Sequence, residues 1–269
     1  MKASEIIFTG PRQSEVRPLS RDRVLDELEF LLTVEHALIV EYLSVSCALG
    51  YDLATADGGP ATEAARDAAT AARALADDQM LRAGGVVRAL SGLRPTGAFG
   101  RARGIVDATG REIPLRPPTR EQLEHLLERE ESIAAAVDAR YARLGPAVAV
   151  GGPEGDAFPD DLRAAVEQGT THANAVSVLR DHLGDRPVAE LLRATRRFGG
   201  TEPEKVLLRI SDRTYALVLG ALENFFGDLH GDFGGTFRLM ALGAMDVMND
   251  VNRALVHGGL LPPFRMPSA

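Results

Sequence analysis

The stretch VLDELEFLLTVEHALIVEYL, residues 24–43, decides the fold. Its apolar residues return at steps of three and four positions, as they do along one face of an α-helix. Glu35 interrupts this apolar stripe. A carboxylate that leaves water in this way needs a hydrogen-bond partner, a counter-charge or a metal ion. The stretch therefore predicts a core helix with one polar group directed into the protein interior.

Three later stretches repeat this pattern of an apolar helical stripe with a polar interruption. The interruptions are Asp78 and Arg82 within residues 68–89, Glu130 within residues 123–137, and His172 within residues 165–183. Polar groups at corresponding places on four helices are typical of a helical bundle with a polar centre. We therefore expect these side chains to meet inside the bundle.

The rest of the chain also favours helices, and no segment has the alternation of a strand. The predicted helices cover about residues 21–49, 62–91 with Thr62 as N-cap, 119–144, 159–184, 188–197, 209–226 and 236–257. The stretch 93–117, rich in Pro and Gly, is predicted to be an ordered crossing or a lid over the site. The predicted fold is all-α: a ferritin-like four-helix bundle with additional C-terminal helices. One domain spans 1–269, with an irregular arm over 1–20, the core bundle over 21–184 and the C-terminal helices packed on it over 185–269.

Composition narrows the classes of function. The net charge of −8 over 269 residues argues against nucleic acid as a partner, because phosphates require a basic face. We expect no membrane span and no secretory signal, since no apolar run of sufficient length is evident. The single cysteine, Cys47, rules out an internal disulfide and favours a cytoplasmic location. The expected partner is a small-molecule substrate, and a homo-oligomer remains open.

The polar interruptions fit part of a metal site. Ferritin-like carboxylate proteins hold two metal ions with one Glu from each of two helices and a Glu-x-x-His pair from each of the other two. Glu35 and Glu130 match the single Glu residues, His172 matches one His, and Asp78 is a candidate fourth ligand. Arg82 instead brings a cation to the centre and can neutralise the carboxylates without metal. Bound iron and a metal-free polar network are both open.

Several motifs resemble one family. The segments that carry the resemblance are VEHALIVEYL (34–43), DDQMLRAGGVVRALSGLRP (77–95), LLEREES (126–132), AVEQGTTHANAVSVL (165–179) and GLLPPFRMP (259–267). They are similar to segments of the ferritin-like iminophenyl-pyruvate dimer synthases of violacein-type and rebeccamycin-type pathways. The resemblance implies an iron-dependent oxidative enzyme of secondary metabolism. Arg82 and Gln79 depart from the His and Glu of that family, so it implies ligand roles only for Glu35, Glu130 and His172.

The predicted function is that of a natural-product enzyme acting on a small organic molecule in the bundle centre. In the oxidative version, it is a non-haem iron oxidoreductase, with Glu35 and Glu130 among the iron ligands. In the metal-free version, Arg82 binds an anionic substrate or intermediate beside Tyr42, while Glu35 or Glu130 moves a proton. The alternative is a non-catalytic subunit, either a small-molecule binder or a structural component derived from such an enzyme.

Two other polar residues are weighed against ordinary structural roles. His36 follows Glu35 and is a candidate for orienting it, although an interhelical or surface contact is the favoured interpretation. Tyr215 is long enough to approach a buried site, but tyrosines on apolar faces usually belong to the core.

Overall fold

The computed structural model describes residues 19–51, 60–93, 105–106, 112–113, 137–145, 172–183, 191–194, 196, 198–227 and 233–264. The helices with defined bounds are α1 (Arg21–Ala48), α2 (Pro60–Leu93), α5 (His172–Leu183), α7 (Glu202–Gly227) and α8 (Gly234–His257), and residues 137–145 are also helical. The described part is predominantly helical, which confirms the all-α class. The predicted helix starts near residues 119 and 159 lie outside the described residues.

Helix α1 has the ends that its sequence predicts. Ser20 caps its start by accepting a hydrogen bond from the backbone N–H of Arg23 at 3.4 Å. Gly50 follows its end with a φ of 86°, a left-handed conformation that glycine adopts without steric cost. Both ends of α1 are therefore determined by the residues directly next to them in the sequence.

The starts of two other helices differ from the predictions. Helix α2 begins at Pro60 rather than after Thr62, because the fixed φ of proline suits the first turn of a helix. Helix α7 begins at Glu202, seven residues earlier than expected. Its start is a capping box: Glu204 accepts from the backbone N–H of Thr201 at 2.9 Å, and Thr201 Oγ1 accepts from that of Glu204 at 3.4 Å.

The predicted absence of strands is also corrected in one place. Residues Ile105–Val106 (β1) and Glu112–Ile113 (β2) pair in an antiparallel ladder, within the stretch predicted to be a crossing or lid. The ladder is too short to change the fold class.

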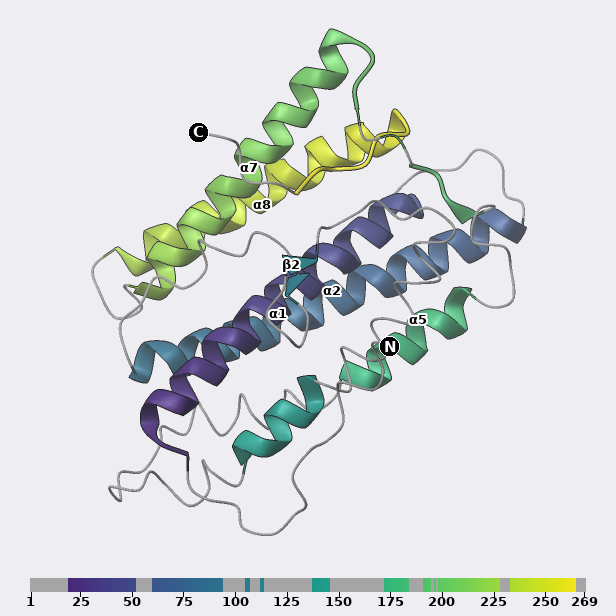
Figure 1. Cartoon of the computed structure of the whole chain (residues 1–269). Helices are drawn as coiled ribbons and strands as arrows, with labels where there is room; N and C mark the ends of the chain where they lie inside the picture. Colours follow the sequence, from purple (N-terminus) through teal and green to yellow (C-terminus); the bar gives the residue numbers. More distant parts are fainter. Residues whose placement is uncertain are drawn as a thin grey trace.

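The helices form three layers (Figure 1). Helices α1 and α2 lie side by side and antiparallel in the middle, with the α7–α8 hairpin on one side and α5 and residues 137–145 on the other. The α1–α2 register is marked by Ser46 Oγ, which donates to the backbone oxygen of Ala69 at 2.9 Å. Helix α8 contacts α1, and α7 contacts α2.

Helix α1 is buried almost all round because it lies in the middle layer. Leu28 and Leu31 are fully buried, and the polar residues Glu35, His36 and Glu41 are at most 5% exposed. Contrary to the expectation from sequence, this helix is long and apolar enough to span a membrane. In the folded chain, 78% of its most apolar 18-residue window is buried. Its hydropathy is that of a core helix in contact with both outer layers.

The α7–α8 hairpin leaves apolar side chains in contact with solvent. The large exposed side chains on these helices are Val206, Ile210, Leu217, Leu239, Met240, Leu242 and Val247. Leu239 is the most exposed of them, at 71%. Exposed apolar residues in such number are typical of a surface that contacts another molecule.

Candidate functional site

A buried carboxylate lies between α1 and the helical residues 137–145. Glu35 and Tyr141 are both fully buried, and Tyr141 Oη donates a hydrogen bond to Glu35 Oε1 at 2.8 Å. Burial, followed by the charge and the hydrogen bond of Glu35, raises the pKa of the Tyr141 hydroxyl. The phenol therefore stays protonated and serves as the donor that the water-deprived carboxylate needs.

Helix α2 contributes polar groups to the same region. Arg82 is half-buried. Its positive charge lowers the pKa of Tyr141, but burial and Glu35 raise that pKa by more. The antiparallel register also brings the fully buried Gln79 to the level of Glu35. The charge of Arg82 is therefore near enough to Tyr141 to affect its pKa, while a meeting of Arg82 with Glu35 stays a prediction.

The predicted inward position of Asp78 is wrong. Asp78 is exposed, whereas the next residue, Gln79, is fully buried. Successive residues on a helix point about 100° apart, and at this turn of α2 it is Gln79, not Asp78, that faces the core. We therefore drop Asp78 as a metal ligand.

Three other residues were predicted to belong to the site: Glu130, His172 and Tyr42. Glu130 lies outside the described residues, and His172 is the first residue of α5 with its side chain outside them. Tyr42 is almost fully buried in the hydrophobic core and does not line either cavity described below. Among the side chains that the structure describes, no three His, Cys, Asp or Glu residues lie close enough to hold one metal ion.

The opposite face of α1 carries a second buried polar pair. His36 Nε2 and the hydroxyl of Tyr215, on α7, are hydrogen-bonded at 2.8 Å, and their rings are stacked with centroids 6.2 Å apart. Burial lowers the pKa of His36 to about 4 and raises that of Tyr215. Both groups are therefore uncharged near neutral pH. The interhelical contact favoured for His36 is confirmed.

This pair forms part of the wall of an inner cavity of about 140 Å³ between α1, α2, α7 and α8. Apart from His36 and Tyr215, its lining is mostly aliphatic and includes Met80, Met245 and Met248. Arg73 and Asn249 form its polar end. Methionine side chains adapt to ligands of different shape, so this lining suits a small organic molecule.

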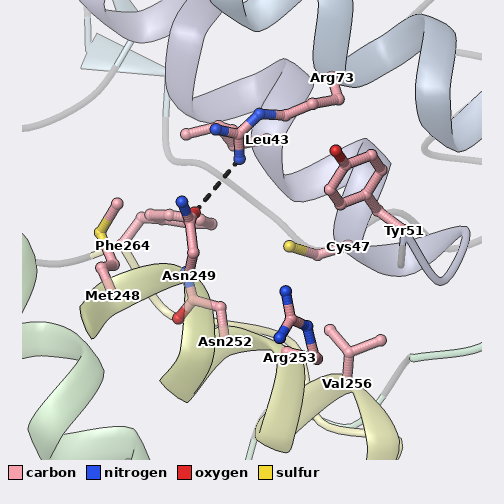
Figure 2. Close-up of a pocket in the computed structure, with 10 residues that line it drawn as sticks. All are labelled: Leu43, Cys47, Tyr51, Arg73, Met248, Asn249, Asn252, Arg253, Val256 and Phe264. Atoms are coloured by element: carbon pink, nitrogen blue, oxygen red, sulfur yellow. Dashed lines mark hydrogen bonds between the residues drawn. The ribbon is translucent and has the colours of Figure 1, made fainter. Parts of the chain in front are cut away.

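A second, outer pocket of about 160 Å³ shares lining residues with the inner cavity. Figure 2 shows the residues that line this outer pocket. Its polar residues are Tyr51, Arg73, Asn249, Asn252 and Arg253, with Cys47 between the two arginines in the view of the figure. Arg73 and Asn249 line both spaces, and Arg73 Nη1 donates to Asn249 Oδ1 at 3.3 Å. This hydrogen bond lies at the boundary between the inner cavity and the outer pocket.

Phe264 connects the outer pocket to the polar pair. It lines the outer pocket, and its ring packs edge-on against Tyr215 with centroids 5.9 Å apart. Its φ of 43° is in the left-handed region, which is uncommon for residues other than glycine. A strained residue at the wall of a pocket is consistent with a functional position.

Sequence reasoning missed Tyr141, Arg73 and the two cavities. Tyr141 and Arg73 belong to ordinary helical sequence, and a cavity has no local signature. A weak signal was available in Met245 and Met248, because adaptable side chains on an otherwise buried helix face are common at ligand sites. Comparison of the chain with protein-family models, curated proteins and solved structures finds no significant match, so the resemblance to iminophenyl-pyruvate dimer synthases rests on the motifs alone.

Proposed function

We propose that the protein is an enzyme of small-molecule, natural-product metabolism built on a ferritin-like bundle, and that it performs acid–base chemistry in the inner cavity. The observation that carries the proposal is the hydrogen-bonded His36–Tyr215 pair in the wall of an otherwise mostly apolar cavity. Buried polar groups are costly, and their placement beside a ligand-sized space is typical of catalytic sites.

The two side chains supply complementary chemistry. With a pKa of about 4, His36 is a neutral imidazole near pH 7 and can accept a proton. Tyr215 keeps its proton because burial raises its pKa, so its hydroxyl can donate to an oxygen of the ligand. In the proposed step, the Tyr215 hydroxyl turns toward a substrate oxygen while His36 Nε2 accepts a substrate proton. Low local polarity strengthens the hydrogen bond that Tyr215 donates.

The size of the cavity limits what it can accept. Its volume of about 140 Å³ is close to that of an engineered apolar cavity, ~150 Å³, that binds benzene. We therefore propose a ligand, or a ligand portion, of the size of one ring, with an oxygen or nitrogen directed at the pair.

Binding is tested with phenol, and the three cavity methionines report it. Protein labelled with ¹³C in the methionine methyl groups gives few signals, because the chain has six methionines. We expect phenol to shift the methyl signals of Met80, Met245 and Met248 saturably, while that of Met240, which is 45% exposed on α8, stays unchanged. Absence of any shift at the cavity methionines would contradict ligand entry.

Catalysis is tested with 1,2-benzisoxazole, whose ring opens when a base removes its C3 proton. The N–O bond then breaks and 2-hydroxybenzonitrile forms, so no other reactant is needed. We expect turnover by the unsubstituted protein, loss of turnover in His36→Gln, and little change in the control His257→Gln, which changes an exposed histidine outside both spaces. Phenol binding with equal ring opening by the protein and His36→Gln would favour the non-catalytic binder.

The iron-dependent version of the proposal concerns the other face of α1. Complete burial of Glu35 supports it, since a carboxylate inside a ferritin-like bundle commonly serves a metal. Iron, when bound, would supply oxidative chemistry at Glu35. Metal analysis of protein produced with iron tests this version: stoichiometric iron that is lost in Glu35→Ala supports it, and iron-free protein contradicts it.

The structural-subunit alternative is supported by the exposed apolar residues of α7 and α8. A homo-oligomer formed through this hairpin would cover them. Light scattering of the unsubstituted protein and of Leu239→Lys tests it. An oligomer that dissociates on this substitution is the expected result, and a monomer over a wide concentration range would exclude self-assembly.

A further inference from the structure

We propose that the outer pocket is a binding site for the phosphate group of a small molecule. This site is separate from the acid–base pair, and its assignment does not depend on the proposed function. Two guanidinium groups from different helices, Arg73 of α2 and Arg253 of α8, line a pocket of about 160 Å³ (Figure 2). Such a pair matches an anion with several oxygens.

Among the described residues that line this pocket, none carries a carboxylate that opposes these two charges. Each arginine forms an ion pair with a carboxylate outside the described lining: Asp77 contacts Arg73 Nε at 3.2 Å, and Asp250 contacts Arg253 Nη1 at 3.3 Å. The side chains of Asp77 and Asp250 are 56% and 76% exposed, so water screens both ion pairs. The two guanidinium groups are therefore the charged groups of the described pocket lining.

Arg73 is oriented before any ligand binds. Its guanidinium lies 5.8 Å from the ring centroid of Tyr51 and is held by Asp77 and Asn249. A guanidinium has five N–H donors, and these two hydrogen bonds use two of them. Ordering the side chain in advance reduces the entropy lost on binding.

The two asparagines add further donors. The amide oxygen of Asn249 accepts from Arg73, and that of Asn252 accepts from Ser211 Oγ at 2.8 Å. The NH₂ group of each amide can therefore donate a hydrogen bond to a ligand. The thiol of Cys47 is protonated near neutral pH, because burial raises its pKa to about 12, and it adds no negative charge.

These features favour phosphate over carboxylate. A carboxylate carries one charge and two oxygens, which a single arginine can satisfy with two parallel hydrogen bonds. A phosphate monoester carries up to two charges and three terminal oxygens, so it can bind arginines on both walls together with an amide. The second arginine is the feature that a carboxylate would not require.

Titration with inorganic phosphate at pH 7.5 and constant ionic strength tests the site. Met248 lines the outer pocket, so its ¹³C-methyl signal should shift saturably, whereas the signal of the exposed Met240 should not. Acetate should bind at least roughly 10-fold more weakly, because one charge is lost. Phosphate affinity should also fall at pH 5, since acidification removes the second negative charge of phosphate. Equal affinity for acetate and phosphate would overturn the preference for phosphate.

Paired substitutions locate the binding. Arg73→Gln and Arg253→Gln should each weaken phosphate binding by roughly 10- to 100-fold, the effect of losing hydrogen bonds to a charged group. The matched controls Arg88→Gln and Arg238→Gln remove exposed arginines from the same two helices and should leave the affinity unchanged. Arg253 is 47% exposed, so its variant should fold even if Arg73→Gln does not.

The outcomes separate this site from the proposed acid–base site. Phenol is read at Met80 and Met245, which line only the inner cavity, and phosphate is read at Met248 with its dependence on Arg253. No saturable phosphate shift, or the same affinity in Arg253→Gln as in Arg238→Gln, would overturn the phosphate site whatever phenol does.

Discussion

Acidification should destabilise this protein through His36 more than through an ordinary exposed histidine. Burial lowers the pKa of His36 from 6.5 to about 4. Between these two values, the unfolded chain binds a proton that the folded chain does not bind. The free energy of unfolding is therefore at its full value above pH 6.5 and falls as the pH is lowered toward 4.

The size of the effect follows from the two pKa values. At pH 4.5, protonation of His36 stabilises the unfolded state far more than the folded state, and the net loss of stability through this one residue is roughly 2–3 kcal/mol. Little reduction for solvent screening applies, because His36 is only 5% exposed. A loss of this size is a large part of the total stability of a typical domain.

The assay is urea unfolding followed by circular dichroism at pH 7.5, 6, 5 and 4.5. His36→Gln removes the titrating imidazole but keeps a side chain that can bond to Tyr215. Over this range, the free energy of unfolding of His36→Gln should fall by roughly 2–3 kcal/mol less than that of the unsubstituted protein. The control His257→Gln changes an exposed histidine at the end of α8 and should largely keep the original slope. Parallel pH profiles for the unsubstituted protein and His36→Gln would refute the reasoning.

Three further outcomes test other parts of the fold. Tyr141→Phe removes the hydroxyl that donates to the buried carboxylate of Glu35 and should lower the free energy of unfolding by roughly 2 kcal/mol. An unchanged free energy in urea unfolding would show that this hydrogen bond does not stabilise the fold. Leu28→Ala, at a fully buried position, should lower the free energy of unfolding by roughly 2–5 kcal/mol, whereas Leu217→Ala, at a position 50% exposed, should change it by no more than about 0.5 kcal/mol. Equal losses in the two variants would contradict the position of Leu28 in the core. Glu204→Gln should lower the thermal midpoint, because its carboxylate caps α7. The pKa of Glu204 is lowered to about 2, first by the backbone N–H that it accepts there and then by a neighbouring guanidinium, so its contribution should be present above pH 4.5 and disappear as the pH falls toward 2. A midpoint that does not depend on this residue would exclude the cap.

The parts of the fold that depend on local chemistry were predictable from sequence. The ends of α1 follow from Ser20 and Gly50, whose preferences act within a few residues. The start of α7 was predictable in principle, because Thr201 and Glu204 have the spacing of a capping box. The apolar repeat of this helix predicts a start only near residue 209, so the repeat alone does not reveal the start at Glu202.

The candidate site was less predictable because it depends on contacts between distant segments. Glu35 could be predicted as buried, since it interrupts an apolar stripe, but its partner Tyr141 is 106 residues away in sequence. The apolar stripe within residues 68–89 is compatible with either Asp78 or Gln79 as the residue that faces the core. The helical period alone leaves an error of one residue at such a position, and one residue is enough to move a side chain from the core to the surface.

The position of α1 in the middle layer explains why its polar residues were the hardest to interpret. A helix with one buried face needs one apolar stripe, and a polar residue off that stripe is normally exposed. Helix α1 contacts both outer layers, so Glu35 and His36 are both buried although they are adjacent and point about 100° apart. Each is hydrogen-bonded to a tyrosine from a different side, Tyr141 for Glu35 and Tyr215 for His36. An apolar substitution at either tyrosine would leave a buried polar group on α1 without that bond, while the hydropathy of α1 would not change. The two tyrosines therefore make the packing of both outer layers specific, and hydropathy analysis of α1 alone cannot detect them.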